Sequence, residues 1–93
     1  MKYGIARTSR FKREYKLMQK RGADMQLLHD TIDLLRQGIP LPAKYRDHAL
    51  TGNFSGTREC HIKPDWLLVY QIEEDILVLT LMRTGTHSDL FKK

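Results

Sequence analysis

Apolar side chains recur every three or four residues in the stretch between residues 9 and 21, at Phe11, Tyr15 and Met18. This spacing places them on one face of a helix. Thr8 or Ser9 offers an N-cap for that helix, and Gly22 ends the run. The pattern therefore predicts a first amphipathic helix near the N-terminus.

A second helical pattern follows almost at once. It begins after Asp24 and ends before Gly38, and its apolar positions are Met25, Leu28, Ile32 and Leu35. Two helices joined by so short a turn are expected to form an antiparallel helical hairpin.

The segments around this hairpin are typical of strands and loops. Residues 1–6 predict a short strand with Tyr3 and Ile5 on one face. Residues 39–42 (IPLP) are predicted to be extended, because each proline disfavours helix at the residue before it. Residues 43–56 combine glycines and asparagine with polar side chains, which predicts a surface loop.

Three further strands are predicted in the second half of the chain, at about residues 57–62, Leu67–Ile72 and Ile76–Met82. Glu73–Asp75 forms the polar turn before the last strand, which is apolar on both faces and is therefore expected to be central in the sheet. Thr86 and Asp89 predict a capping box for one last helical turn through Leu90 and Phe91. The order predicts one α+β domain over residues 1–93, with a three-stranded antiparallel meander after the helical hairpin.

Composition excludes several classes of protein. Apolar residues make up 41% of the 93 residues, which is enough for one core. No stretch approaches the roughly 20 apolar residues of a membrane span, and the first ten residues lack the apolar core of a signal peptide. The lone cysteine, Cys60, has no partner for an internal disulfide. We therefore expect a cytoplasmic protein without membrane association.

The positive charge is concentrated at the N-terminus. The chain has 16 Lys and Arg against 11 Asp and Glu. Its first 22 residues carry a single acid, Glu14, and these basic residues: Lys2, Arg7, Arg10, Lys12, Arg13, Lys16, Lys20 and Arg21. Such a block attracts polyanions through phosphate contacts and counterion release. The alternative is a solvated helix face that only keeps a small protein soluble.

The predicted meander gathers reactive side chains at one edge of the sheet. His61 closes the first of its strands, Asp65 and Trp66 open the second, Arg83 closes the third, and His87 follows four residues later. In an antiparallel meander these strand ends are neighbours. The topology therefore places two histidines, a carboxylate, an arginine and a tryptophan together.

Two other histidines are treated differently. His48 lies in the preceding loop, where topology does not place it, and His29 on the polar side of the second helix is expected to be a surface residue.

This set of side chains suits cleavage of RNA by its own 2′-hydroxyl. Histidines can act as the base that deprotonates this hydroxyl and as the acid that protonates the departing 5′-oxygen. Arg83 can stabilise charge on the phosphoryl oxygens, and Trp66 offers a stacking face for a base. No metal and no cofactor are required, because the substrate supplies the nucleophile.

Other interpretations of these residues remain open. Trp66 can equally be a core residue, and Arg83 an exposed charge at a strand end. His48, His61, Asp65 and His87 also supply metal-ligand types, although their spacing is irregular and lacks a histidine pair at i, i+4.

Two segments, YRDHALTGNFSGTRECHIKPDWLLVY and RTGTHSDLF, resemble the YafQ branch of the RelE/ParE toxin superfamily. A loop histidine before L-x-G, a H-x-x-P-D-W run ending in tyrosine, and R-T-G-[ST]-H occur in that order. The resemblance covers essentially the whole chain. It implies the RelE-like fold and an endoribonuclease (mRNA interferase) that cuts translated mRNA in the A site of the 70S ribosome.

The resemblance also implies the functional residues: His48, His61, Asp65, Trp66, Arg83, His87 and Phe91. Our hypothesis is that Asp65 with His61 assists deprotonation of the 2′-hydroxyl and that His87 is the general acid. Arg83 then holds the scissile phosphate, and His48 orients the phosphate or shares the acid–base work.

The resemblance further implies the partners. A cognate antitoxin wraps and inhibits the toxin, and the complex represses its own operon. The basic helix is expected to contact ribosomal RNA through Lys12, Lys16 and Lys20. Two rival functions stay open, a gyrase-inhibiting relative on the same scaffold and a nucleic-acid-binding module without chemistry.

Overall fold

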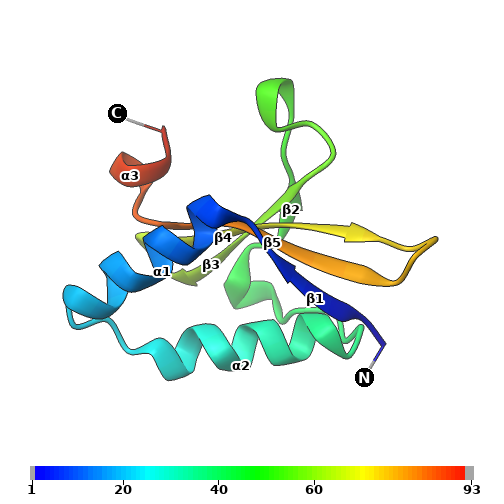
Figure 1. The fold of residues 1–93 in the computed structure, drawn as a ribbon, viewed down its shortest axis with the longest axis horizontal. Coiled ribbons are helices and arrows are strands. Elements are labelled where there is room, and N and C mark those ends of the chain that lie inside the picture. The colour runs from blue at the N-terminus through cyan, green and yellow to red at the C-terminus, as the bar shows by residue number, and fades with distance from the viewer. Residues whose placement is uncertain (1, 92–93) are drawn as a thin grey trace.

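A five-stranded mixed sheet forms the centre of the protein, in a computed structural model that describes residues 2–91 (Figure 1). Met1, which the pattern assigned to the first strand, and residues 92–93 at the end of the predicted domain lie outside the described residues. The strands are arranged in the order β1-β5-β4-β3-β2, with β1 parallel to β5 and the other pairs antiparallel. The elements in chain order are β1 (Gly4–Arg7), α1 (Ser9–Lys20), α2 (Met25–Arg36), η1 (Ala43–Tyr45), β2 (His48–Ala49), η2 (Gly52–Phe54), β3 (Arg58–Lys63), β4 (Trp66–Glu73), β5 (Val78–Gly85) and α3 (His87–Phe91). The predicted α+β class is confirmed.

Local capping fixes the two long helices, as the sequence predicts. The Thr8 hydroxyl accepts a hydrogen bond from the Phe11 N–H at the start of α1, and the Asp24 carboxylate accepts one from the Gln26 N–H at the start of α2. Gly22 follows α1 with a φ of +81°, a left-handed conformation that glycine adopts without a steric penalty. The helices form the expected hairpin, and it covers one face of the sheet (Figure 1).

The sheet is buried on both faces but unequally. Alternate residues of β4 point to opposite sides. Trp66, Leu68 and Tyr70 join the main core under the helical hairpin. Leu67 and Val69 pack on the other side in a smaller cluster with Leu90 of α3. Burying each such side chain stabilises the fold by about 1.5–3 kcal/mol. The smaller cluster leaves the second face less covered.

Several predicted boundaries are wrong. The first strand, predicted at residues 1–6, spans Gly4–Arg7, and Glu73, assigned to the turn, ends β4. The last strand begins at Val78, because its parallel pairing with β1 starts there, and it runs on to Gly85. Ile76 and Leu77 instead lie in the preceding turn with 59% and 47% of their surface exposed. The expectation that this strand is interior is confirmed, since β5 lies between β1 and β4.

The predicted loop at residues 43–56 contains a strand that the pattern does not reveal. His48 and Ala49 form β2 and pair with Glu59 and Arg58 of β3. Two residues are too few to show an alternating pattern, so only the pairing identifies them. Among residues 2–91 no helix has the length and apolar character needed to cross a bilayer.

Candidate active site

Three imidazoles form a row on the less covered face of the sheet. His48 comes from β2, His61 from β3 and His87 from the first position of α3. The ring centroids of His48 and His61 are 6.4 Å apart, and those of His61 and His87 are 5.8 Å apart. The structure therefore brings together the two histidines that topology gathers, and adds His48 through its pairing with β3.

Asp65 fixes the orientation of His87. Its Oδ1 accepts hydrogen bonds from the His87 backbone N–H at 3.0 Å and from Nδ1 at 2.6 Å. These bonds, the backbone one first, lower the pKa of the Asp65 carboxyl below its ordinary value. The hypothesis places Asp65 with His61, and the structure pairs it with His87 instead. The Nδ1 contact leaves Nε2 as the nitrogen that His87 can present to a substrate.

The predicted capping box holds the start of α3 in place. The Asp89 carboxylate accepts from the Thr86 N–H at 2.9 Å, and the Thr86 hydroxyl accepts from the Asp89 N–H at 3.2 Å. Arg21 at the end of α1 donates to both oxygens of Asp89. The hydrogen bond from Arg21 is the main reason that the pKa of Asp89 is lowered to about 2. The helix that carries His87 is therefore tied to α1.

Glu59 is a site residue that the sequence reasoning missed. Its side chain is only 7% exposed, and its Oε1 lies 3.5 Å from His48 Nε2. The other nitrogen of His48, Nδ1, lies 2.7 Å from the carbonyl oxygen of Arg46. Glu59 and His61 are two positions apart on β3 and so share a face, a pattern that the strand prediction already contained.

Two buried polar atoms next to this row have no hydrogen-bond partner within residues 2–91. They are Glu59 Oε2 and His61 Nδ1. Leaving such an atom unpaired costs about 1–3 kcal/mol, so a stable protein rarely does it without a reason. Their position on one face of β3 indicates a site shaped for something other than stability.

A cavity of about 490 Å³ adjoins His61. The charged side chains that line it are all cationic: Lys44, Arg46 and Lys63. Leu27, Tyr45 and Ile62 also line it and pack against the main core, so the cavity lies on the hairpin side of β3 and adds positive charge near His61.

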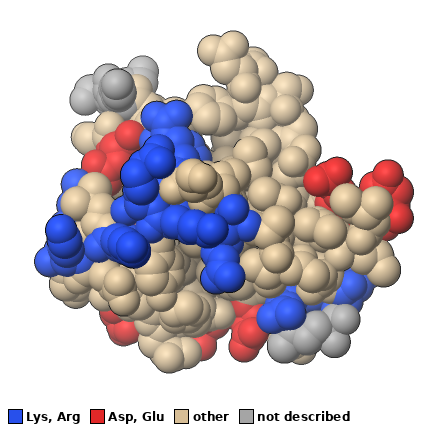
Figure 2. Space-filling view, in the orientation of Figure 1, with Lys and Arg blue, Asp and Glu red and all other residues tan. Residues whose placement is uncertain are grey.

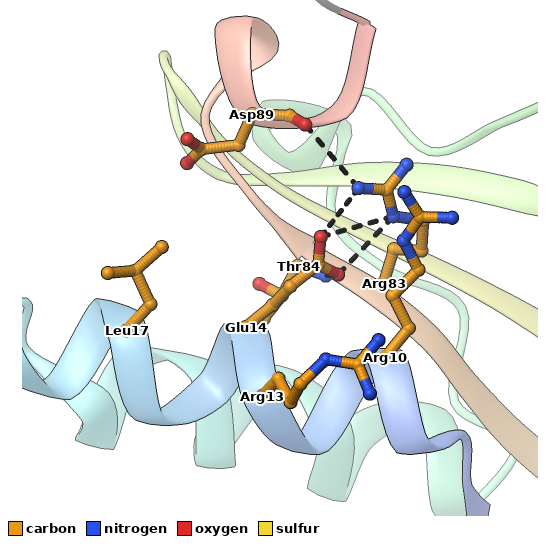
Figure 3. A pocket seen from close by; sticks show the side chains of 7 residues that line it. All are labelled: Arg10, Arg13, Glu14, Leu17, Arg83, Thr84 and Asp89. Atoms are coloured by element: carbon orange, nitrogen blue, oxygen red, sulfur yellow. Dashed lines mark hydrogen bonds and ion pairs between the residues drawn. The ribbon is translucent and has the colours of Figure 1, made fainter.

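The position of Arg83 differs from the expectation. Its guanidinium donates to Glu14 of α1, with the closest contact at 2.6 Å, and to the carbonyl oxygens of Asp89 and Leu90 in α3 (Figure 3). None of its partners among the described residues is a histidine. Without RNA, its donors join β5, α1 and α3, and the hypothesis that Arg83 holds the scissile phosphate stays a prediction.

Trp66 is a core residue in the structure. It is 3% exposed, and its Nε1–H donates to the Thr84 hydroxyl at 2.9 Å. A base cannot stack on a ring that the main core covers, so the expected stacking role is wrong for this conformation. Phe91 is different, because it stays partly exposed and meets Phe54 of η2 edge-on at 5.6 Å.

The basic residues of α1 form a continuous positive surface. Figure 2 shows a band of Lys and Arg side chains over this helix, with one acidic patch beside it at the upper left. Lys12, Lys16 and Lys20 are all exposed, as a ribosome-binding role requires. His29 of α2 pairs with Tyr15 of α1 at 2.7 Å and stays outside the row of imidazoles.

The metal-site alternative lacks geometric support. Within the part of the chain that the structure describes, no three His, Cys, Asp or Glu side chains are placed to hold a metal ion together.

Comparison with known proteins agrees with this geometry. Residues 3–92 match a family model described as the bacterial toxin of type II toxin-antitoxin system, YafQ. The mRNA interferase toxin YafQ of Escherichia coli K12 is 41% identical over 88 residues, which are 94% of each chain. Crystal structures of E. coli YafQ (TM-score 0.90, 39% identity) and of the E. coli DinJ–YafQ complex (TM-score 0.87, 40% identity) each cover 96% of this chain and 98% of theirs. The chain therefore belongs to the YafQ family of bacterial toxins from type II toxin–antitoxin systems.

Proposed function

We propose that this protein is an mRNA interferase that cuts translated messenger RNA in the ribosomal A site by attack of the RNA 2′-hydroxyl, without a metal. The observation that carries the proposal is the row of three imidazoles, with His87 fixed by Asp65. The interferase activity of the E. coli relative supports it.

The reaction needs a base and an acid on opposite sides of one phosphorus. As the 2′-oxygen bonds to phosphorus and the bond to the 5′-oxygen breaks, one proton leaves the nucleophile and one reaches the leaving group. His61 and His87, with ring centroids 5.8 Å apart, can flank a phosphodiester in this way. His61 is the proposed base and His87 the proposed acid, which yields a 2′,3′-cyclic phosphate and a free 5′-hydroxyl.

The remaining site residues hold this pair and its substrate. Asp65 fixes the tautomer and direction of His87 in the manner of a triad carboxylate. His48 orients the phosphate or shares the acid–base work, and Glu59 steadies its ring. Arg46 and Lys63 add positive charge near His61 that attracts the RNA backbone. Phe91, in place of Trp66, offers an apolar surface to a base.

Substitution of the histidines tests this function. With ribosomes translating a defined message, we expect His61→Ala and His87→Ala each to lower the cleavage rate by about 100-fold or more. His29→Ala is the matched control, because His29 lies outside the row. Primer extension maps the cuts, and treatment of the toxin with EDTA that is removed before the ribosomes are added is expected to leave them unchanged. Full cleavage by His87→Ala refutes the assignment. If expression of the wild type in growing cells damages DNA and leaves messages uncut, the gyrase-inhibiting alternative is indicated.

The basic surface of α1 is proposed to bind ribosomal RNA. Reversing the charge of Lys12, Lys16 and Lys20 together is expected to weaken co-sedimentation with 70S ribosomes, because each lost phosphate contact reduces the counterion release on binding. Replacing the same three residues by arginine keeps the charge and serves as the control. Unchanged co-sedimentation of the reversed variant means that the patch only provides solubility.

A cognate antitoxin is the second proposed partner. The complex of the E. coli relative with DinJ supports a protein inhibitor for this chain as well. We further propose that the complex binds its own operator. Co-expression with the neighbouring reading frame, followed by gel filtration and operator-binding assays, tests both points.

A further inference from the structure

A second cavity, of about 320 Å³, lies between α1, β5 and α3 (Figure 3). Arg10, Arg13, Glu14 and Leu17 line it from α1, where their spacing places them on neighbouring positions of one helical face. Arg83, Thr84 and Asp89 close it from the sheet and from α3.

The charges in this cavity do not balance. Its two carboxylates are already committed, Glu14 to Arg83 and Asp89 to Arg21. Arg10 and Arg13 are exposed, and within residues 2–91 no ion pair involves either of them. The cavity therefore presents two free guanidinium groups, whose planar donors fit two oxygens of one phosphate.

The cavity is also close to the reacting groups. Asp89 in its wall is two residues after His87, which corresponds to about 3 Å along the axis of α3. Side chains two residues apart point to different sides of a helix, so His87 and the cavity lie on different sides of α3, and an RNA strand that follows this short helix can contact both. Arg83 belongs to the wall but is neutralised by Glu14, so the attraction comes from Arg10 and Arg13.

We propose that Arg10 and Arg13 form a binding subsite for an RNA phosphodiester in this cavity beside α3. The proposal rests on the nuclease function above and adds a positioning contact outside the row of histidines. The phosphate belongs either to the messenger or to ribosomal RNA, and the chemistry of recognition is the same.

Messages with one uncharged methylphosphonate linkage distinguish the two sources. On programmed ribosomes, wild type is expected to lose about 10-fold in cleavage rate when one particular flanking linkage is neutralised. The variant R10A/R13A is expected to be slow on every message and to show no extra loss at that linkage. K12A/K16A removes the same charge from another face of α1, so it is the matched control and retains the extra loss.

If R10A/R13A instead shows the same linkage penalties as wild type but binds ribosomes about 10-fold more weakly than K12A/K16A does, the phosphate is ribosomal. If neither cleavage nor ribosome binding changes, or if only antitoxin binding weakens, the proposal is overturned. Thermal melting of R10A/R13A at the wild-type temperature shows that the variant is folded, as expected for two exposed side chains.

A binding assay separates this subsite from the chemistry. A short 2′-O-methyl RNA, which cannot be cleaved, is expected to bind wild type and His87→Ala equally at low salt, and R10A/R13A about 10-fold more weakly. The slope of log K against log salt should fall by about 0.7 for the one phosphate lost. If wild type does not cleave RNA but the three proteins bind as expected, the nuclease function is refuted and the subsite is supported. Equal binding by R10A/R13A sinks the subsite alone.

Discussion

Arg83 gives the sharpest test of the structure, because its two possible roles predict different behaviour. If Arg83 only bound phosphate, its removal would reduce cleavage and leave the fold unchanged. In the structure it joins Glu14 of α1 to the carbonyl oxygens of Asp89 and Leu90 in α3. Arg83→Met keeps the aliphatic part of the side chain and deletes these hydrogen bonds, so it is expected to destabilise the protein.

The size of the effect follows from burial. The side chains of Arg83 and Glu14 are 12% and 14% exposed. Removing one partner of a buried ion pair costs about 3–5 kcal/mol. Water reaches part of this pair, and Glu14 still accepts from the Thr84 N–H, so we expect the lower end, about 3 kcal/mol. For a domain of this length that corresponds to a drop in Tm of about 12–24 °C.

Urea unfolding of wild type, Arg83→Met and Arg13→Met measures this loss. Arg13 lines the same cavity but is exposed and has no ion pair within residues 2–91, so its variant should stay within about 0.5 kcal/mol of wild type. Hydrogen exchange at the Leu90 amide, which bonds to Thr86, is expected to lose protection in Arg83→Met. The double variant Glu14→Met with Arg83→Met should regain part of the loss, because no buried charge is left alone. Wild-type stability and protection in Arg83→Met refute this reasoning and return Arg83 to the phosphate.

Other predictions concern the core and the link between α1 and α3. Burial raises the pKa of the Cys60 thiol well above its ordinary value, so iodoacetamide at pH 8 should label Cys60 only after denaturation; labelling of the native protein contradicts this. Arg21 and the Thr86 groups keep the pKa of Asp89 at about 2, so this carboxylate stabilises the fold fully above about pH 4 and loses its contribution as the pH falls towards 2. In Asp89→Asn the free energy of unfolding should change less with pH between those values than it does in wild type. The same pH dependence in both proteins argues against the contact. Trp66→Ala should lower the free energy of unfolding by about 3–5 kcal/mol, against a negligible change for an exposed stacking platform.

The helices and most strands are predictable from the sequence, because the forces that set them are local. Thr8 and Asp24 cap the helices within three residues of themselves, and the periodicity of Phe11 and Met18 already marks the buried face. The same holds for the capping box of α3. The meander then brings His61 and His87 together, since short connections leave few other arrangements.

What the sequence settled by itself is therefore the class of the fold, the family and the set of acid–base side chains. Tertiary structure alone decided which of them meet. Asp65 bonds to His87 at a sequence separation of 22 residues, and Glu14 pairs with Arg83 at a separation of 69. His48 joins the row only through a two-residue strand. The physical reason is that each of these contacts joins two elements, and their meeting depends on how the helices and turns pack on the sheet and on how the strands pair. A residue's partners therefore depend on register and on burial across the sheet, which no local pattern specifies.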